Sequence, residues 1–221
     1  MNRRPALLAA ATLTVAAALA LSACGGGEGD SKGNDKIAGA DSGDEAKESQ
    51  APSATAPSDS VDRPKIVVPK DVKLVFTPEA AGDEKTDAVL RDNAEYWRAI
   101  IDSIEKQDPK SEPVRFYSKG AGLLGTIEWS GNFIKSDMTL AGTVRFTDRK
   151  VTFSKDGSAG LTYCSDESKG YTKDRKTHKK NVTPASKDSY ILYNDRLRKN
   201  ADGVWQLTNS TSEMGSAQCQ P

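Results

Sequence analysis

The sequence predicts an α+β domain in which helices come first and a meandering antiparallel sheet follows. Apolar residues recur at spacings of three and four before residue 108, which is typical of amphipathic helix, and at every second position after Asp137, which is typical of strands. Two Asp-Gly pairs, at 156–157 and 202–203, indicate hairpin turns between successive strands. Helices followed by consecutive strands, instead of alternating with them, favour the α+β class.

A secretion signal precedes this domain. Arg3 and Arg4 are followed by a mostly apolar run over residues 5–21, which ends in Leu-Ser-Ala-Cys with the cysteine at position 24. This ending resembles the lipobox of bacterial lipoproteins, whose cysteine is acylated and becomes the first residue of the mature chain. A transmembrane anchor is the alternative, although the run is Ala-rich and slightly short for a span. We therefore expect a lipoprotein signal peptide over 1–23 and a palmitate-bearing lipid on Cys24.

Residues 24–64 have the composition of a disordered linker. Between Gly25 and Asp62 there are nine acidic residues, three lysines and no aromatic residue. Such a segment buries too little apolar area to offset the entropy of ordering it. The predicted organisation is therefore a signal peptide, an acidic linker and one folded domain over 65–221, held at the outer face of the bacterial cytoplasmic membrane.

Each element of the domain has its own pattern. Residues 63–78 alternate prolines with β-branched runs and predict extended chain. A helix capped by Thr86 or Asp87 should follow and end before Pro109, with charged residues on its other faces. Its apolar stripe consists of Leu90, Ala94, Trp97, Ile101 and Ile104, and the residues expected on other faces are Asp92, Arg98, Asp102 and Glu105.

Two shorter helical stretches are expected next, one from Pro113 to Tyr117 and one through Leu123, Leu124 and Ile127. Glycines at 120, 122 and 125 weaken the pattern of the second stretch. Strands are then expected around residues 140–153, 161–164, 189–198 and 204–207.

Cysteine usage agrees with an extracytoplasmic location. If Cys24 carries a lipid, only Cys164 and Cys219 remain to pair. A disulfide is the usual state of such a pair outside the cytoplasm. A catalytic thiol or a metal site is the alternative, but neither cysteine has a histidine nearby in the sequence and no CxxC motif is present.

The order of these motifs resembles the nuclear-transport-factor-two-like (cystatin-like) superfamily, and in detail uncharacterised actinobacterial cell-surface lipoproteins of that kind. The matching segments are LSAC at 21–24, PKDVKLVF at 69–76, YCSDES at 163–168, DGVWQLT at 202–208 and the closing Cys219. The resemblance covers 65–221 and implies a cone in which helices and a curved sheet enclose a cavity. It implies no single function, because this scaffold hosts isomerases, cyclases, transport factors and assembly modules.

Catalytic motifs are sparse. The single histidine, His178, lies in a lysine-rich segment expected to be an exposed loop, and the sequence has no serine elbow, phosphate-binding glycine loop or HExxH motif. Tyr163, Asp166, Asp188 and Tyr190 are the candidates for an acid–tyrosine site, with turn or solvent roles as the alternative for both aspartates. We expect no catalytic set, no metal and no cofactor.

Two sets of residues are candidates for binding. Tyr96, Trp97, Trp129 and Phe133 are candidates to line a pocket for a small apolar ligand; ordinary core packing is the competing interpretation and is favoured for Trp97. Residues 169–187 predict a basic hairpin, favoured as a solvated edge loop, with contact to anionic polymer or lipid as the alternative. Its contact candidates are Lys173, Arg175, Lys176, Lys179 and Lys180.

Together these observations predict a lipid-anchored envelope protein with a non-catalytic domain that binds a partner protein, a wall polymer or a small apolar ligand. Equal numbers of basic and acidic residues, 31 of each, argue against a nucleic-acid partner. The alternative is a cone-fold isomerase or cyclase-like enzyme that uses Asp and Tyr in an internal pocket.

Overall fold

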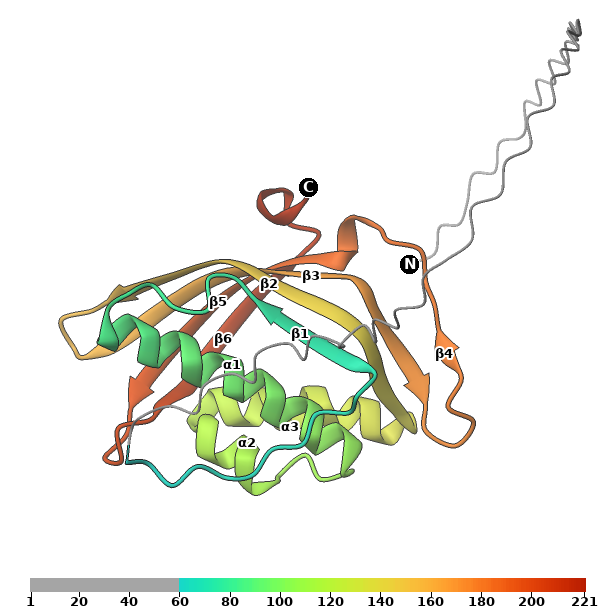
Figure 1. Cartoon of the computed structure of the whole chain (residues 1–221), viewed down its shortest axis with the longest axis horizontal. Coiled ribbons are helices and arrows are strands. Elements are labelled where there is room, and N and C mark those ends of the chain that lie inside the picture. Colours follow the sequence, from blue (N-terminus) through green and yellow to red (C-terminus); the bar gives the residue numbers. More distant parts are fainter. Residues whose placement is uncertain (1–59) are drawn as a thin grey trace, which may run out of the picture. The chain divides into compact units, whose positions relative to one another are not determined.

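Six strands form one curved sheet that arches over three helices (Figure 1). The computed structural model describes residues 60–221, so the predictions for the signal peptide, for Cys24 and for most of the linker lie outside the described residues. In chain order the elements are β1 (Val72–Phe76), α1 (Glu84–Glu105), α2 (Glu112–Tyr117), α3 (Gly120–Lys135), β2 (Met138–Phe153), β3 (Ser158–Asp174), β4 (Lys180–Asn181), β5 (Tyr190–Lys199) and β6 (Trp205–Met214), with short 3-10 turns at Lys187–Ser189 and Ala217–Cys219.

The strand order is β1-β2-β3-β5-β6, and β4 pairs with the end of β3. Both expected Asp-Gly turns are present, between β2 and β3 and between β5 and β6. The expectation of a wholly antiparallel sheet is wrong at β1, which pairs parallel to β2. Parallel neighbours need a long crossover, and here the three helices provide it.

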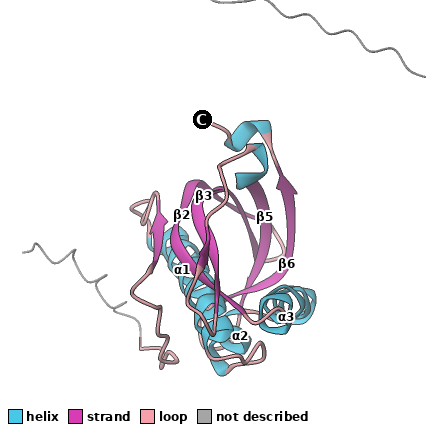
Figure 2. Cartoon of the chain, turned by 90° about the vertical axis from the view of Figure 1, so that its right-hand side faces the viewer, coloured by secondary structure: helices cyan, strands magenta, loops and turns pink. Residues whose placement is uncertain are grey.

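Register shifts in the two longest strands accompany the curvature of the sheet. The pairing of β2 with β3 shifts between Thr143 and Arg145 and again between Thr147 and Lys150, and each shift is a point at which a strand bends. Seen end on, the sheet is curved and the three helices gather on one side of it (Figure 2). The predicted α+β class and curved sheet are confirmed.

Helix α1 buries its predicted apolar stripe against the sheet. Its N-cap is Asp83, whose carboxylate accepts a hydrogen bond from the Thr86 backbone N–H at 2.9 Å, so the predicted caps are wrong. Asp87 instead accepts hydrogen bonds from the backbone N–H groups of Ala81 and Gly82, which close the approach to the helix.

Two acidic residues of α1, expected on its polar faces, are buried instead. Asp92 accepts the Trp205 backbone N–H at 2.7 Å and pairs with Arg63 at 2.9 Å. Asp102 accepts the Val67 backbone N–H at 3.1 Å. Both are sheltered because they hold other segments against the helix, a role that hydrophobic spacing does not reveal. Ordered contacts thus reach back to Arg63, within the expected linker.

The C-terminal end of the chain is fastened by the expected disulfide between Cys164 and Cys219, whose Cα atoms are 5.4 Å apart. On the other side, α3 packs closely on β6 through Gly122. A Cβ on Gly122 would lie 2.7 Å from the Leu207 carbonyl oxygen, so only glycine permits this approach. Within residues 60–221, no helix is long and apolar enough to cross a membrane.

Candidate functional site

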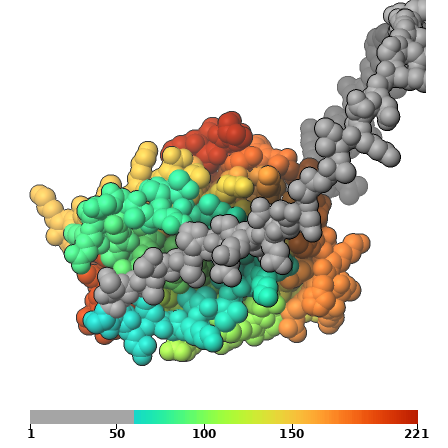
Figure 3. Space-filling model, viewed as in Figure 1, coloured from blue at the N-terminus to red at the C-terminus, as the bar shows by residue number. Residues whose placement is uncertain are grey.

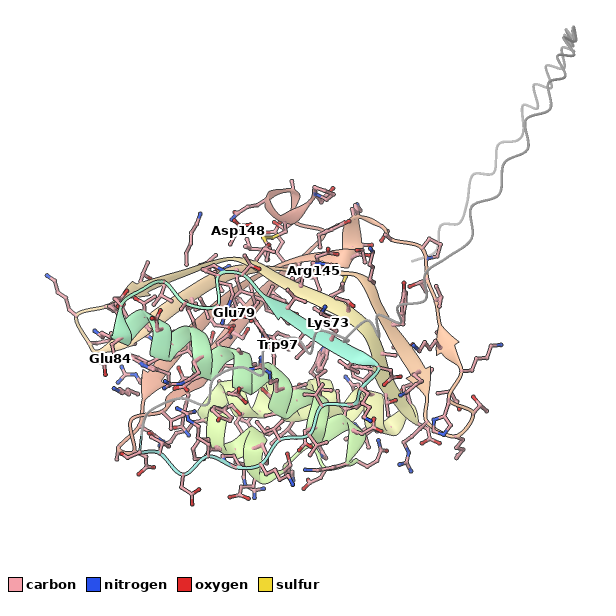
Figure 4. The ribbon with its side chains drawn as sticks, in the orientation of Figure 1. Lys73, Glu79, Glu84, Trp97, Arg145 and Asp148 are labelled. Carbon is pink, nitrogen blue, oxygen red and sulfur yellow. A yellow bond between two sulfur atoms is a disulfide. The ribbon has the colours of Figure 1, made fainter. Side chains whose placement is uncertain are left out.

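Two adjoining cavities lie between the sheet and the helices, and Trp97 and Trp129 line both. Figure 4 shows Trp97 between α1 and the sheet. The first, which we call the β6 cavity, has a volume of about 240 Å³; its lining includes Tyr96, Thr126, Tyr163, Tyr193, Ser210 and Ser212. The second, which we call the β2 cavity, has a volume of about 250 Å³; its lining includes Leu74, Ile101, Phe133, Leu140, Phe146 and Glu167.

The structure brings the predicted pocket residues together. Trp97 meets Trp129 edge to face with ring centroids 6.3 Å apart, and Trp129 lies 4.7 Å from Phe133. Tyr96 and the two tryptophans line the β6 cavity, whereas Phe133 and the same tryptophans line the β2 cavity. Trp97 is also part of the core, while Trp129 is 39% exposed and therefore lies where the cavities open to solvent.

A buried hydrogen-bond network lies behind the β6 cavity. The Tyr163 hydroxyl donates to Asp195 Oδ2 at 2.9 Å and accepts from Trp97 Nε1 at 3.0 Å. Ser210 donates to Asp195 Oδ1 at 2.6 Å, and the Asn93 amide donates to Oδ2 at 3.3 Å. Burial raises the pKa of Asp195 to about 6, although the hydrogen bonds from Ser210 and Tyr163 oppose that shift. Asp195 itself lines neither of the two cavities.

The Tyr96 hydroxyl is also hydrogen-bonded within the protein. Thr126 donates its only hydroxyl proton to the Gly122 carbonyl at 2.8 Å, so Tyr96 must be the donor in its 2.8 Å bond to Thr126. Burial raises the pKa of Tyr96. The β6 cavity therefore has two tyrosine hydroxyls in its wall, at Tyr96 and Tyr163, whose protons already have acceptors.

Among residues 60–221, Glu167 supplies the only carboxylate in the lining of either cavity. It accepts a hydrogen bond from the Ser165 hydroxyl at 3.2 Å. No Lys, Arg or His within residues 60–221 forms an ion pair with it. Desolvation raises the pKa of Glu167, and the neighbouring Asp166 raises it further.

Tyr193 lies near Glu167 and lines the β6 cavity. Its ring stacks on Tyr163 with centroids 5.1 Å apart, and it meets Trp97 edge to face. Burial raises the pKa of Tyr193, and the nearby Glu167 carboxylate adds to the shift. Among the described residues, no hydrogen-bond partner faces its hydroxyl, which leaves that group available to a ligand.

The expected acid–tyrosine constellation does not form. Asp166 lies 4.0 Å from Arg145 and accepts the Ser168 backbone N–H, and Asp188 is exposed in a 3-10 turn. Tyr163 meets Asp195 instead. Alternation along β3 puts Tyr163, Ser165 and Glu167 on one face, a pattern visible in the sequence, but the register shift beside Asp166 hides which acid turns inward.

The predicted basic hairpin is partly strand. Lys173 lies in β3 and pairs with Asp71 at 2.9 Å, while Arg175 and Lys176 pair with Asp137 at 3.2 and 2.7 Å. Lys179 and Lys180 are exposed, as is His178. The segment projects from one end of the domain and is orange in Figure 3. Asp71 and Asp137 thus neutralise part of the positive charge of this segment.

Metal-binding clusters are absent from the described part of the chain: no three His, Cys, Asp or Glu side chains converge there. Cys24, the expected lipidation site, lies outside residues 60–221.

No protein-family model matches the chain, and no curated protein matches its sequence. Solved structures with a similar fold include a ketosteroid isomerase-like protein from Erwinia carotovora atroseptica, 16% identical with a TM-score of 0.41, for which the match covers 61% of this chain and 98% of that one. A domain of cystatin-like fold from Nostoc punctiforme is 15% identical with a TM-score of 0.37, and the match covers 60% of this chain and 78% of that one. At these identities and scores, the similarity says nothing about the ligand or activity of this chain.

Proposed function

We propose that this chain is an extracytoplasmic lipoprotein, held at the outer face of the bacterial cytoplasmic membrane by a lipid on Cys24, whose domain binds a small, largely apolar ligand without transforming it. The β2 cavity carries the binding part of this proposal. The signal-like N-terminus and its cysteine support the anchoring part.

The character of the β2 cavity favours an apolar ligand. Aliphatic and aromatic side chains from β1, α1, α3 and β2 form most of its lining. Water gains few hydrogen bonds in such a space, and apolar cavities of about 150 Å³ are known to stay dry and to bind small hydrocarbons. Trp129, which lines the cavity, is also partly exposed to solvent.

The polar groups in and behind the wall of the β6 cavity argue for binding without catalysis. The tyrosine hydroxyls of Tyr96 and Tyr163 donate to protein acceptors, and Asp195 is enclosed by Asn93, Tyr163 and Ser210. These groups therefore stabilise the wall. General acid–base chemistry needs a group within hydrogen-bond reach of the reacting atom.

A cavity-filling substitution tests the binding proposal. Leu140→Trp replaces a leucine in the lining of the β2 cavity by the larger tryptophan side chain. Leu124→Trp makes the same exchange on the outside of α3, where Leu124 is 68% exposed. Saturation-transfer NMR with indole should show binding to the unmodified protein and to the Leu124 variant, with affinity about tenfold lower or worse for the Leu140 variant, a loss of about 1.4 kcal/mol. Equal affinity in both variants, or no binding to the unmodified protein, would contradict the proposal.

Anchoring is tested separately. Cys24→Ala removes the thiol that the lipid would occupy, so labelling with radioactive palmitate should disappear and the protein should leave the membrane fraction or stay unprocessed. Continued acyl labelling of the variant would exclude Cys24 as the lipidation site.

An isomerase or cyclase-like activity is the second candidate, and Glu167 is the observation that favours it. A carboxylate with a raised pKa beside an apolar cavity has the properties of a general base, and the free Tyr193 hydroxyl could donate to a substrate oxygen. If an isomerisable ketone were turned over, Glu167→Gln should abolish turnover while preserving binding.

A further inference from the structure

We propose that the ligand of the β2 cavity carries a positively charged organic group, such as a quaternary or alkylated ammonium, which pairs with Glu167 against the aromatic wall. This inference rests on the proposed binding function and specifies the class of ligand.

The first argument is the unbalanced charge of Glu167. A carboxylate that is partly removed from water is costly unless a cation or several donors compensate it. Among the described residues, the Ser165 hydroxyl is the one donor to this side chain. None of the ion pairs among residues 60–221 includes Glu167, and Arg145 faces the neighbouring Asp166 at 4.0 Å. A cationic ligand would supply the missing partner.

The second argument is the aromatic wall of the same cavity. Trp97, Trp129 and Phe133 form a contiguous set of rings that lines the same cavity as Glu167. Aromatic faces attract organic cations, with tryptophan the strongest of the three side-chain types, and cages of such rings recognise quaternary ammonium groups. A carboxylate together with these rings favours a charged head that also has apolar surface.

The third argument excludes an inorganic cation. Calcium requires six to eight oxygen ligands and magnesium a near-ideal octahedron of oxygens. The β2 cavity has one carboxylate and is otherwise largely apolar, and no metal-binding cluster exists among residues 60–221. An alkylated ammonium needs no such shell, because its methyl groups can contact the apolar lining directly.

A matched pair of probes tests this inference. Choline and neohexyl alcohol have the same shape, but a carbon replaces the charged nitrogen in the alcohol. Calorimetric titration of the full chain should give an affinity for choline about tenfold higher than for neohexyl alcohol. Glu167→Gln should bring the two affinities together, and Trp129→Leu should weaken choline more than the alcohol.

Glu128→Gln is the charge control, because it removes a carboxylate from the exposed side of α3 next to Trp129. It should leave the preference for choline unchanged. Retained binding of neohexyl alcohol to the Glu167 variant shows that the variant is folded. Equal affinity for both probes in the unmodified protein, or a preference for choline that survives Glu167→Gln, would overturn the inference and leave apolar binding intact. Binding of neither probe would count against the inference and the proposed binding function together.

Discussion

Buried acidic residues are the feature of this domain that residue-by-residue reading of the sequence misses. Asp92, Asp102 and Asp195 have ordinary sequence neighbours, and their partners lie on distant segments. The aromatic residues are different. A large aromatic ring on a helix with a clear apolar pattern is usually buried, so the burial of Tyr96 and Trp97 could be predicted.

Asp195 gives the first prediction. Its folded-state pKa, about 6, lies above the ordinary value of 3.8, so the native state holds the proton more tightly than the unfolded state does. The free energy of unfolding should therefore fall as pH rises from about 4 to 6, by about 3 kcal/mol at roughly 1.4 kcal/mol per pKa unit.

Asp195→Asn removes this titration while keeping one acceptor oxygen. Urea unfolding at several pH values should show a smaller decrease for the variant than for the unmodified protein between pH 4 and 7. Parallel pH profiles for the two proteins would show that Asp195 ionises as easily in the folded chain as in the unfolded one.

At the scale of elements, the packing of α3 depends on its glycines in opposite ways. A Cβ on Gly122 would collide with the Leu207 carbonyl of β6, whereas a Cβ on Gly131 would meet nothing within 4 Å. Gly122→Ala should therefore destabilise the domain by about 1–3 kcal/mol through overpacking. Gly131→Ala should stabilise it by up to about 1 kcal/mol, because alanine is the better helix former.

Thermal unfolding of the two alanine variants measures this difference. Both substitutions change helix propensity equally, so a lower Tm for the Gly122 variant alone isolates the contact with β6. Equal shifts in Tm would mean that α3 can move away from the sheet at little cost in free energy. The wall of the β6 cavity would then deform easily.

The elements themselves were largely predictable, whereas their faces were not. Hydrophobic spacing located α1, and the Asp-Gly pairs located both hairpins. Alternation along β3 places Glu167 on the same face as Tyr163 and Ser165, but the register shift between Thr143 and Arg145 adds an extra residue to β3 between Asp166 and Lys169, and no local pattern announces it. Likewise, β1 pairs parallel because the crossover through the helices returns the chain beside it, which is a property of topology.

At the scale of the whole molecule, the disulfide joins the middle of the sheet to the C-terminus across a sequence separation of 55 residues. Closing a loop of this length stabilises by about 4 kcal/mol on the chain-entropy model. The double variant Cys164→Ala, Cys219→Ser should lose unfolding free energy of that order in urea, and reduction of the unmodified protein should give the same loss. Unchanged stability in both experiments would contradict this role.

The central claim is that this domain holds a small ligand between its sheet and its helices. Native mass spectrometry of the full mature chain, recovered gently from the membranes of the cells that make it, tests that claim most directly. We predict a stoichiometric adduct of a small molecule that is retained in Leu124→Trp and missing from Leu140→Trp. An unmodified protein that carries no adduct, or an adduct that persists in Leu140→Trp, would contradict the account.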